Sequence, residues 1–155
     1  MSSDATSQLG MVHRLPKAKI VDRVEYLTKV AEGKRVVHVG FVDAGFQAMQ
    51  HASGTWLHAH LAEHATSLVG LDVDEPGVAD AKARGYEAYT VDGTSAEAVR
   101  ALGLGPADVV IAGEVIEHVD DPGLFLDAMR VLLLRAARRE QRVRLEVPAT
   151  HQPVV

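Results

Sequence analysis

Residues 36–45 are the stretch that most constrains how this chain can fold. They read Val-Val-His-Val-Gly-Phe-Val-Asp-Ala-Gly, so β-branched residues flank one histidine and a glycine ends the run. A run without helical period is typical of a short buried strand that enters a tight turn. Residues 47–64 then have helical character. A strand, a glycine turn and a helix in this order predict a site for nucleotide-like ligands, unless the glycines serve only the geometry of the turn.

The rest of the chain alternates between the periods of strands and helices. Further strands are predicted at residues 67–71, 86–91 and 107–112, and helices at residues 20–31, 76–84, 95–102 and 123–134. Such alternation predicts an α/β fold with a doubly wound, mostly parallel sheet, and a candidate strand at residues 142–148 brings the number of strands to about five. The helix over residues 20–31 is expected to bury an apolar face that begins at Ile20 and Val21.

Composition excludes several classes of protein. The 155-residue chain is 47% hydrophobic, lacks cysteine and carries a net charge of −5. This composition predicts one globular domain without disulfides or thiolate metal sites. The negative charge argues against nucleic-acid and anionic-membrane partners, and no apolar run reaches the roughly 20 residues that cross a bilayer. We therefore expect a cytoplasmic protein.

A histidine pair raises the question of a metal site. His60 and His64 stand in the order H-x-x-E-H on one face of the expected helix, as in a family of zinc peptidases. A third ligand on a separate helix has no clear candidate, and the chain holds 8 histidines. We therefore predict that these side chains belong to a solvated helix face and that the protein binds no metal.

Three carboxylates follow expected strands at their carboxyl ends. Asp72, Asp92 and Glu114 each stand at or just beyond such an end. The carboxyl ends of parallel strands share one edge of the sheet, so these side chains should gather beside the glycine turn. A carboxylate suits a ribose because its two oxygens can accept from two adjacent hydroxyls. Each of them, taken alone, is equally compatible with a solvated loop acid.

Over residues 20–134 the chain resembles the class I S-adenosylmethionine-dependent methyltransferases, which have a Rossmann-like fold. Residues 107–133 are similar to the family's fourth strand, its acidic-histidine loop and the helix that follows, and residues 69–73 and 91–94 resemble its ribose-binding and adenine-binding strand ends. The resemblance implies an S-adenosyl-L-methionine cofactor and a small-molecule methyl acceptor. The cofactor-binding residues that it implies are His38, Gly40, Phe41, Asp72, Val73, Asp92, Gly93 and Glu114.

The resemblance also implies individual roles. Gly40 would lie under the methionine part of the cofactor, Asp72 would bind the ribose and Asp92 the adenine. Methyl transfer mainly requires alignment of the nucleophile, so a general base is optional, and His118 is the weak candidate for one.

Two features depart from the pattern of the family. His38 replaces an acidic residue, and Val42 and Ala44 replace glycines. Val42 is expected to crowd the cofactor, because β-branched residues resist left-handed backbone angles. After residue 134 the expected turn and final strands are missing, so the fold should be incomplete at its carboxyl end. The organisation that follows is a disordered segment 1–15, a cofactor-binding domain 16–134 and an atypical tail 135–155, with an uncovered sheet edge through which dimers can form.

Two alternatives remain open at this stage. The first is a nicotinamide-dependent oxidoreductase, although Asp72 lies farther from the glycines than the roughly 20 residues that its fingerprint requires. The second is a non-catalytic, methyltransferase-like fragment.

Overall fold

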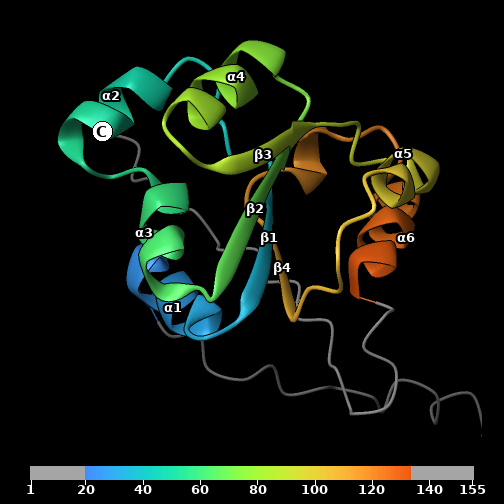
Figure 1. Ribbon diagram of the computed structural model, residues 1–155, viewed down its shortest axis with the longest axis horizontal. Helices are drawn as coiled ribbons and strands as arrows, with labels where there is room; N and C mark the ends of the chain where they lie inside the picture. The colour runs from blue at the N-terminus through green and yellow to red at the C-terminus, as the bar shows by residue number, and fades with distance from the viewer. Residues whose placement is uncertain (1–19, 134–155) are drawn as a thin grey trace, which may run out of the picture.

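The computed structural model describes residues 20–133, which form one parallel sheet with helices on both faces (Figure 1). The strands are β1 (Arg35–Val39), β2 (Ser67–Asp72), β3 (Glu87–Thr90) and β4 (Val109–Ala112). The helices are α1 (Arg23–Ala31), α2 (Gln47–Ser53), α3 (Leu57–His64), α4 (Glu75–Ala83), α5 (Ala96–Ala101), α6 (Pro122–Leu133) and the short 3₁₀ helix η1 (Ile116–His118). The strand order is β3-β2-β1-β4, and every pairing is parallel. The doubly wound α/β fold predicted from the sequence is confirmed.

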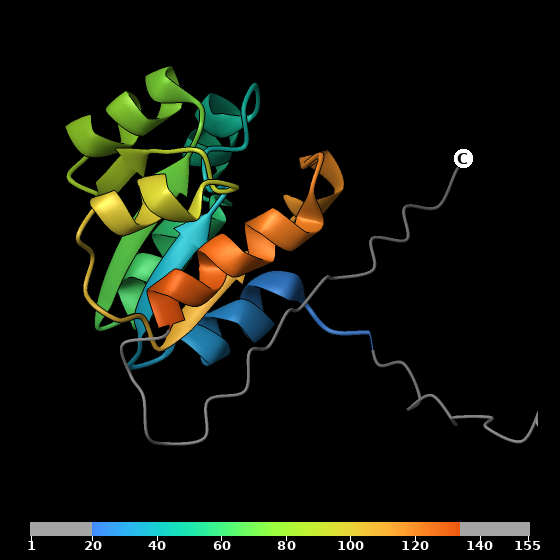
Figure 2. The ribbon, with the colours of Figure 1, turned by 90° about the vertical axis from the view of Figure 1, so that its right-hand side faces the viewer.

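The sheet separates the hydrophobic core into two layers. On one face, Val37 and Val39 of β1 pack with Leu71 against α5 and α6, where Phe125 is almost fully buried. On the other face, Val36 packs against α1 and α3, and α4 covers the side of β3. Figure 2 shows α6 in front of β1, and Figure 1 shows α1 and α3 on the opposite side of the sheet. Successive side chains of one strand therefore pack against helices on opposite faces of the sheet, because the strand is pleated.

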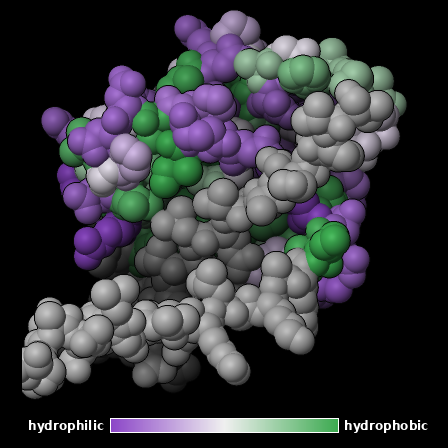
Figure 3. All heavy atoms as spheres, turned by 180° about the vertical axis from the view of Figure 1, so that it is seen from behind, coloured by the Kyte–Doolittle hydropathy of each residue, from purple (hydrophilic) through white to green (hydrophobic). Residues whose placement is uncertain are grey.

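The expected helix over residues 47–64 is two helices. Gly54 adopts a left-handed φ of 67° and ends α2. Trp56 then turns inward, is 2% exposed, and donates its indole N–H to the carbonyl of Phe41 at 3.0 Å. Helix α2 buries none of its residues, and Figure 3 shows a pale, moderately apolar surface over it at the upper right. Because of this break, α3 packs against one face of the sheet, while α2 lies at the carboxyl edge of the sheet.

The first helix begins later than expected. Asp22 caps it by accepting the N–H of Glu25 at 2.8 Å, so α1 starts at Arg23. Ile20 and Val21 therefore precede the helix and are exposed, which corrects the prediction that they belong to its buried face.

The predictions made for residues 1–15 and for the tail 135–155, including its strand, lie outside the described residues. Across residues 20–133, none of the helices has the length and apolar character needed to span a membrane.

Candidate functional site

The glycine turn after β1 is held close to two neighbouring segments. Gly40 has a φ of 67°, and its N–H donates to the carbonyl of Leu71 at 2.8 Å. A Cβ at this position would overlap Cγ2 of Val115, which follows β4. The turn thus needs glycine both for its backbone angle and for the contact.

Val42 does not adopt the left-handed backbone conformation, which a β-branched residue resists. Asp43 does so instead, with a φ of 55°. The side chain of Val42 is 1% exposed and packs against Gly77 of α4, where a Cβ would overlap Cγ1 of Val42. Val42 therefore lies in the core and does not crowd the surface of the turn, because Gly77 leaves room for it.

Asp72 links the end of β2 to the glycine turn. Its Oδ2 accepts the N–H of Val42 at 2.9 Å, and its Oδ1 accepts the N–H of Asp74 at 3.0 Å. The side chain is half-buried. A carboxylate oxygen can accept more than one hydrogen bond, so both oxygens still have capacity for a pair of hydroxyls.

Asp92 and Gly93 follow β3 on the same edge. The hydroxyl and the backbone N–H of Thr94 donate to Oδ1 of Asp92 at 2.7 and 2.8 Å, and they hold the pKa of that carboxyl below its usual value. Its Oδ2 has no partner among the described residues. A Cβ on Gly93 would come within 3.3 Å of the ring of Phe125, so this segment lies directly over the core.

Glu114 follows β4 and pairs with a residue that the sequence interpretation missed. It is exposed, its φ is 57°, and its Oε1 lies 2.9 Å from Nη1 of Arg23. Nη2 of Arg23 lies against Gly113, and its Nε is buried without a partner among the described residues. A cation in the first turn of a helix opposes the helix dipole. This unfavourable placement is a sequence signal that Arg23 has another task.

The remaining predicted residues differ in exposure. His38 and Phe41 are 3% and 2% exposed and face the side of the sheet that carries α3. Val73 is 69% exposed, and His118 is an exposed residue of η1. The structure therefore places Gly40, Asp72, Asp92 and Glu114 at or just beyond the carboxyl ends of four neighbouring strands, while His38 and Phe41 are buried.

The two histidines of the H-x-x-E-H pattern face their own backbone. Nε2 of His60 lies 2.9 Å from the carbonyl of Gly54, and Nδ1 of His64 lies 2.9 Å from the carbonyl of His60. Within residues 20–133 no three potential ligands are grouped for a metal ion. That the protein binds no zinc stays a prediction.

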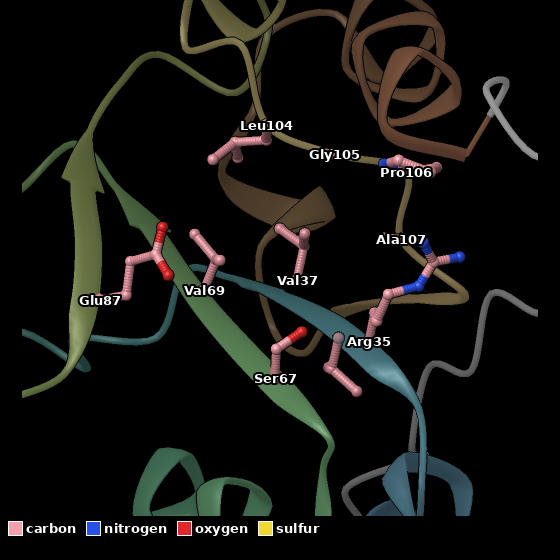
Figure 4. Close-up of a pocket in the computed structure, with 10 residues that line it drawn as sticks. Arg35, Val37, Ser67, Val69, Glu87, Leu104, Gly105, Pro106 and Ala107 are labelled. Carbon is pink, nitrogen blue, oxygen red and sulfur yellow. The ribbon is translucent and has the colours of Figure 1, made fainter.

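A separate hollow lies at the amino edge of the sheet. Figure 4 shows Glu87, Val69 and Val37 on three neighbouring strands, facing the loop that carries Leu104 and Pro106. None of the predicted site residues lines it. We therefore assign the candidate site to the opposite, carboxyl edge.

Comparison with known proteins defines the family. Residues 52–136 match the family model described as a methyltransferase domain. The chain belongs to this family. The match begins at the last two residues of α2, continues through α6, and includes the segments of Asp72, Asp92 and Glu114.

Individual relatives agree with this assignment. The chain is 31% identical over 105 residues to the ubiquinone biosynthesis O-methyltransferase of Caulobacter sp. (strain K31), covering 66% of this chain and 37% of that protein. It is 36% identical over 83 residues to the protein of the same name from Caulobacter vibrioides, covering 52% and 33%. The chain thus spans about a third of the length of these relatives.

Two methyltransferases among the solved structures match this chain, both with TM-scores below 0.5. One is the trans-methyltransferase CalH complexed with SAH, at 21% identity and a TM-score of 0.49, covering 71% of this chain and 32% of that chain. Another is the sugar N-methyltransferase KedS8 from Streptoalloteichus sp., at 18% identity and a TM-score of 0.48, covering 85% and 53%.

Proposed function

We propose that this methyltransferase domain binds S-adenosylmethionine along the carboxyl edge of its sheet and takes part in methyl transfer to a small molecule. The observation that carries the proposal is the alignment of Gly40, Asp72, Asp92 and Glu114, each of which lies at or just beyond the carboxyl end of one of four adjacent parallel strands. In open parallel sheets, ligands bind outside this edge. Membership of the methyltransferase family supports the same cofactor.

The residues present fit the parts of such a cofactor. The carboxylate of Asp72 suits the two ribose hydroxyls, and Oδ2 of Asp92 suits the adenine amino group. Arg23 would bind the carboxylate of the amino-acid end, since a guanidinium favours planar carboxylate partners and the side chain of Arg23 is 35% exposed beside Glu114. Glu114 holds that guanidinium in place through their 2.9 Å ion pair and lines the same end of the site.

The cofactor would supply a methyl group on a sulfonium, and the domain would align it with the acceptor and exclude water. The contacts of Gly40 with Val115 and with the carbonyl of Leu71 fix the turn on which this alignment depends. His118, exposed in η1, is the candidate general base for an acceptor that must lose a proton.

The finer proposal is that the acceptor atom is an oxygen. It rests on the two Caulobacter relatives, which are named ubiquinone biosynthesis O-methyltransferases. Only about a third of each relative is matched, so residues outside this chain can contribute to acceptor recognition in those proteins.

Calorimetry on the full 155-residue chain tests the proposed cofactor. We expect S-adenosylmethionine and S-adenosylhomocysteine to bind with a stoichiometry of one and NAD not to bind. Binding of NAD without binding of either sulfur nucleoside would favour the oxidoreductase alternative. A folded chain that binds none of the three would be a non-catalytic fragment.

A further inference from the structure

Helix α2 turns its polar side toward the protein and its apolar side toward solvent. Its partly buried residues are Gln47, Gln50 and His51, which share one side of the helix because they are three or four positions apart. Met49 is 62% exposed, and Phe46, which directly precedes the helix, is 56% exposed. A helix that packs on a protein core normally has the opposite arrangement. The apolar side of α2 is therefore open to a ligand.

Polar contacts hold α2 at the carboxyl edge of the sheet. Nε2 of Gln47 donates to the carbonyl of Gly77 in α4 at 3.4 Å, and Gln50 donates to the carboxylate of Asp43. The ring of His51 lies on Trp56, with centroids 4.2 Å apart. Figure 1 shows α2 next to α4 at the end of the sheet where the strands finish. These contacts occupy the polar side of α2 and leave its apolar side free.

A glycine bounds α2 at each end. Gly45 and Gly54 have left-handed φ values of 89° and 67°, and a Cβ would meet nothing within 4 Å at either position. Segments that close over ligands commonly turn about small residues of this kind. Helix α2 can therefore adjust its position over a ligand while the glycine turn and α3 stay packed.

The apolar side of α2 continues into the proposed cofactor site. The N–H of Phe46 donates to the carbonyl of Asp43 at 3.0 Å, and the N–H of Val42, one residue earlier, donates to Oδ2 of Asp72 at 2.9 Å. Val73, which follows Asp72, is also exposed. The exposed apolar residues thus adjoin the carboxylate proposed to bind the ribose, where an acceptor can approach the cofactor.

The charges around α2 argue against a membrane as the partner of its apolar side. The sequence contains no lysine or arginine between Arg35 and Lys82. Burial lowers the pKa of His51, so α2 carries no cation near pH 7. Helices that lie on anionic membranes depend on lysine and arginine along their polar side. The neighbouring carboxylate of Asp43 would be repelled by such a surface.

The size of the apolar surface argues against a second protein chain. Phe46 and Met49 are its two large side chains, and an aromatic side chain buries at most about 250 Å². A stable protein interface buries about 800 Å² on each partner. Two such side chains match the apolar part of a small molecule instead.

We propose that Phe46 and Met49 bind an uncharged, apolar part of the methyl acceptor, so that α2 selects acceptors whose hydroxyl is attached to a hydrophobic group. This inference rests on the methyl transfer proposed above and adds to it the chemical class of the acceptor and the residues that recognise it.

Calorimetry with two phenols tests this selection in the full chain saturated with S-adenosylhomocysteine. We expect 4-pentylphenol to bind at least about tenfold more tightly than phenol, because each buried methylene adds affinity. In Phe46→Gln and in Met49→Gln, the affinity for 4-pentylphenol should fall about fivefold, while the affinities for phenol and S-adenosylhomocysteine stay unchanged. Ala48→Gln, at another exposed position of α2, is the matched control.

Other outcomes would overturn the proposal. Equal affinities for the two phenols would do so, as would a preference for 4-pentylphenol that survives both substitutions. If the substitutions instead turned an associated chain into a monomer, or abolished binding to phosphatidylcholine vesicles, the apolar side of α2 would serve a second copy or a membrane. Failure of the unsubstituted chain to bind S-adenosylhomocysteine would refute the proposed cofactor, and the acceptor proposal with it.

Discussion

The carboxylate of Asp72 has both a structural and a ligand-binding part in the proposed site. It accepts the N–H groups of Val42 and Asp74, and it is expected to accept two ribose hydroxyls. Asp72→Ala should weaken binding of S-adenosylhomocysteine by about 1.5–3 kcal/mol, the range for hydrogen bonds to a charged group. Calorimetry measures the change, and Glu63→Ala at an exposed position of α3 is the control. Unchanged affinity in a folded Asp72→Ala chain would remove this residue from the site.

A comparison of Gly40 with Gly33 separates the cost of a side-chain clash from the cost of a left-handed backbone conformation. Gly40 and Gly33 have nearly the same φ, 67° and 65°, but a Cβ would overlap Val115 at Gly40 and would meet nothing within 4 Å at Gly33. Gly33→Ala should therefore cost only the left-handed conformation, about 1–2 kcal/mol of the free energy of unfolding. Gly40→Ala should cost clearly more, and Val115→Ala in the same chain should recover part of the difference. Urea unfolding measures all three, and equal losses at the two glycines would contradict the contact with Val115.

At the scale of elements, the glycine turn and α4 depend on each other through Val42 and Gly77. Gly77→Ala should destabilise the chain by about 1–3 kcal/mol, because the new Cβ would overlap a buried side chain. In the double variant Val42→Ala/Gly77→Ala the overlap is removed, so its loss should be smaller than the sum of the single losses. Denaturant unfolding of the four chains gives the coupling energy. Additive losses would show that Val42 and Gly77 do not pack together.

At the scale of the whole molecule, the buried imidazoles of His38 and His58 should make the fold sensitive to acid. Their pKa values are lowered in the folded chain, while in the unfolded chain histidine titrates near 6.5. Below pH about 6.5 the unfolded chain thus binds more protons, and the free energy of unfolding should fall by about 2–3 kcal/mol between pH 7 and about 5.5. The pKa of Asp108, lowered to about 2 by Arg35, affects stability only at lower pH.

Urea unfolding as a function of pH measures this dependence, and His58→Phe should halve it because one of the two titrating groups is gone. Stability that stays constant between pH 7 and 5.5 would show that the imidazoles are not buried as neutral groups.

The arrangement of the sheet also affects association. Within residues 20–133, β4 pairs only with β1 and forms one edge of the sheet. Its residues Val109–Ala112 are apolar, and an apolar strand edge tends to pair with another chain. We expect sedimentation velocity to show dimers or larger species that increase with concentration, and thermal unfolding at or below about 45 °C. A monomer at all concentrations with a much higher melting temperature would show that this edge is covered in the intact chain.

The sequence alone determined the order of the elements and the edge on which Asp72, Asp92 and Glu114 gather. These follow from local patterns: alternating periods give parallel strands, and the residue after a parallel strand always lies at the same edge. Three contacts were decided only by the tertiary structure. They are the packing of Val42 against Gly77, the pairing of Arg23 with Glu114 and the contact of His38 with His58. Each joins segments separated by many residues, through contacts that neither segment specifies by itself. Gly77 makes room for Val42, and Gly54 breaks the expected helix so that α3 can bring His58 beneath the turn.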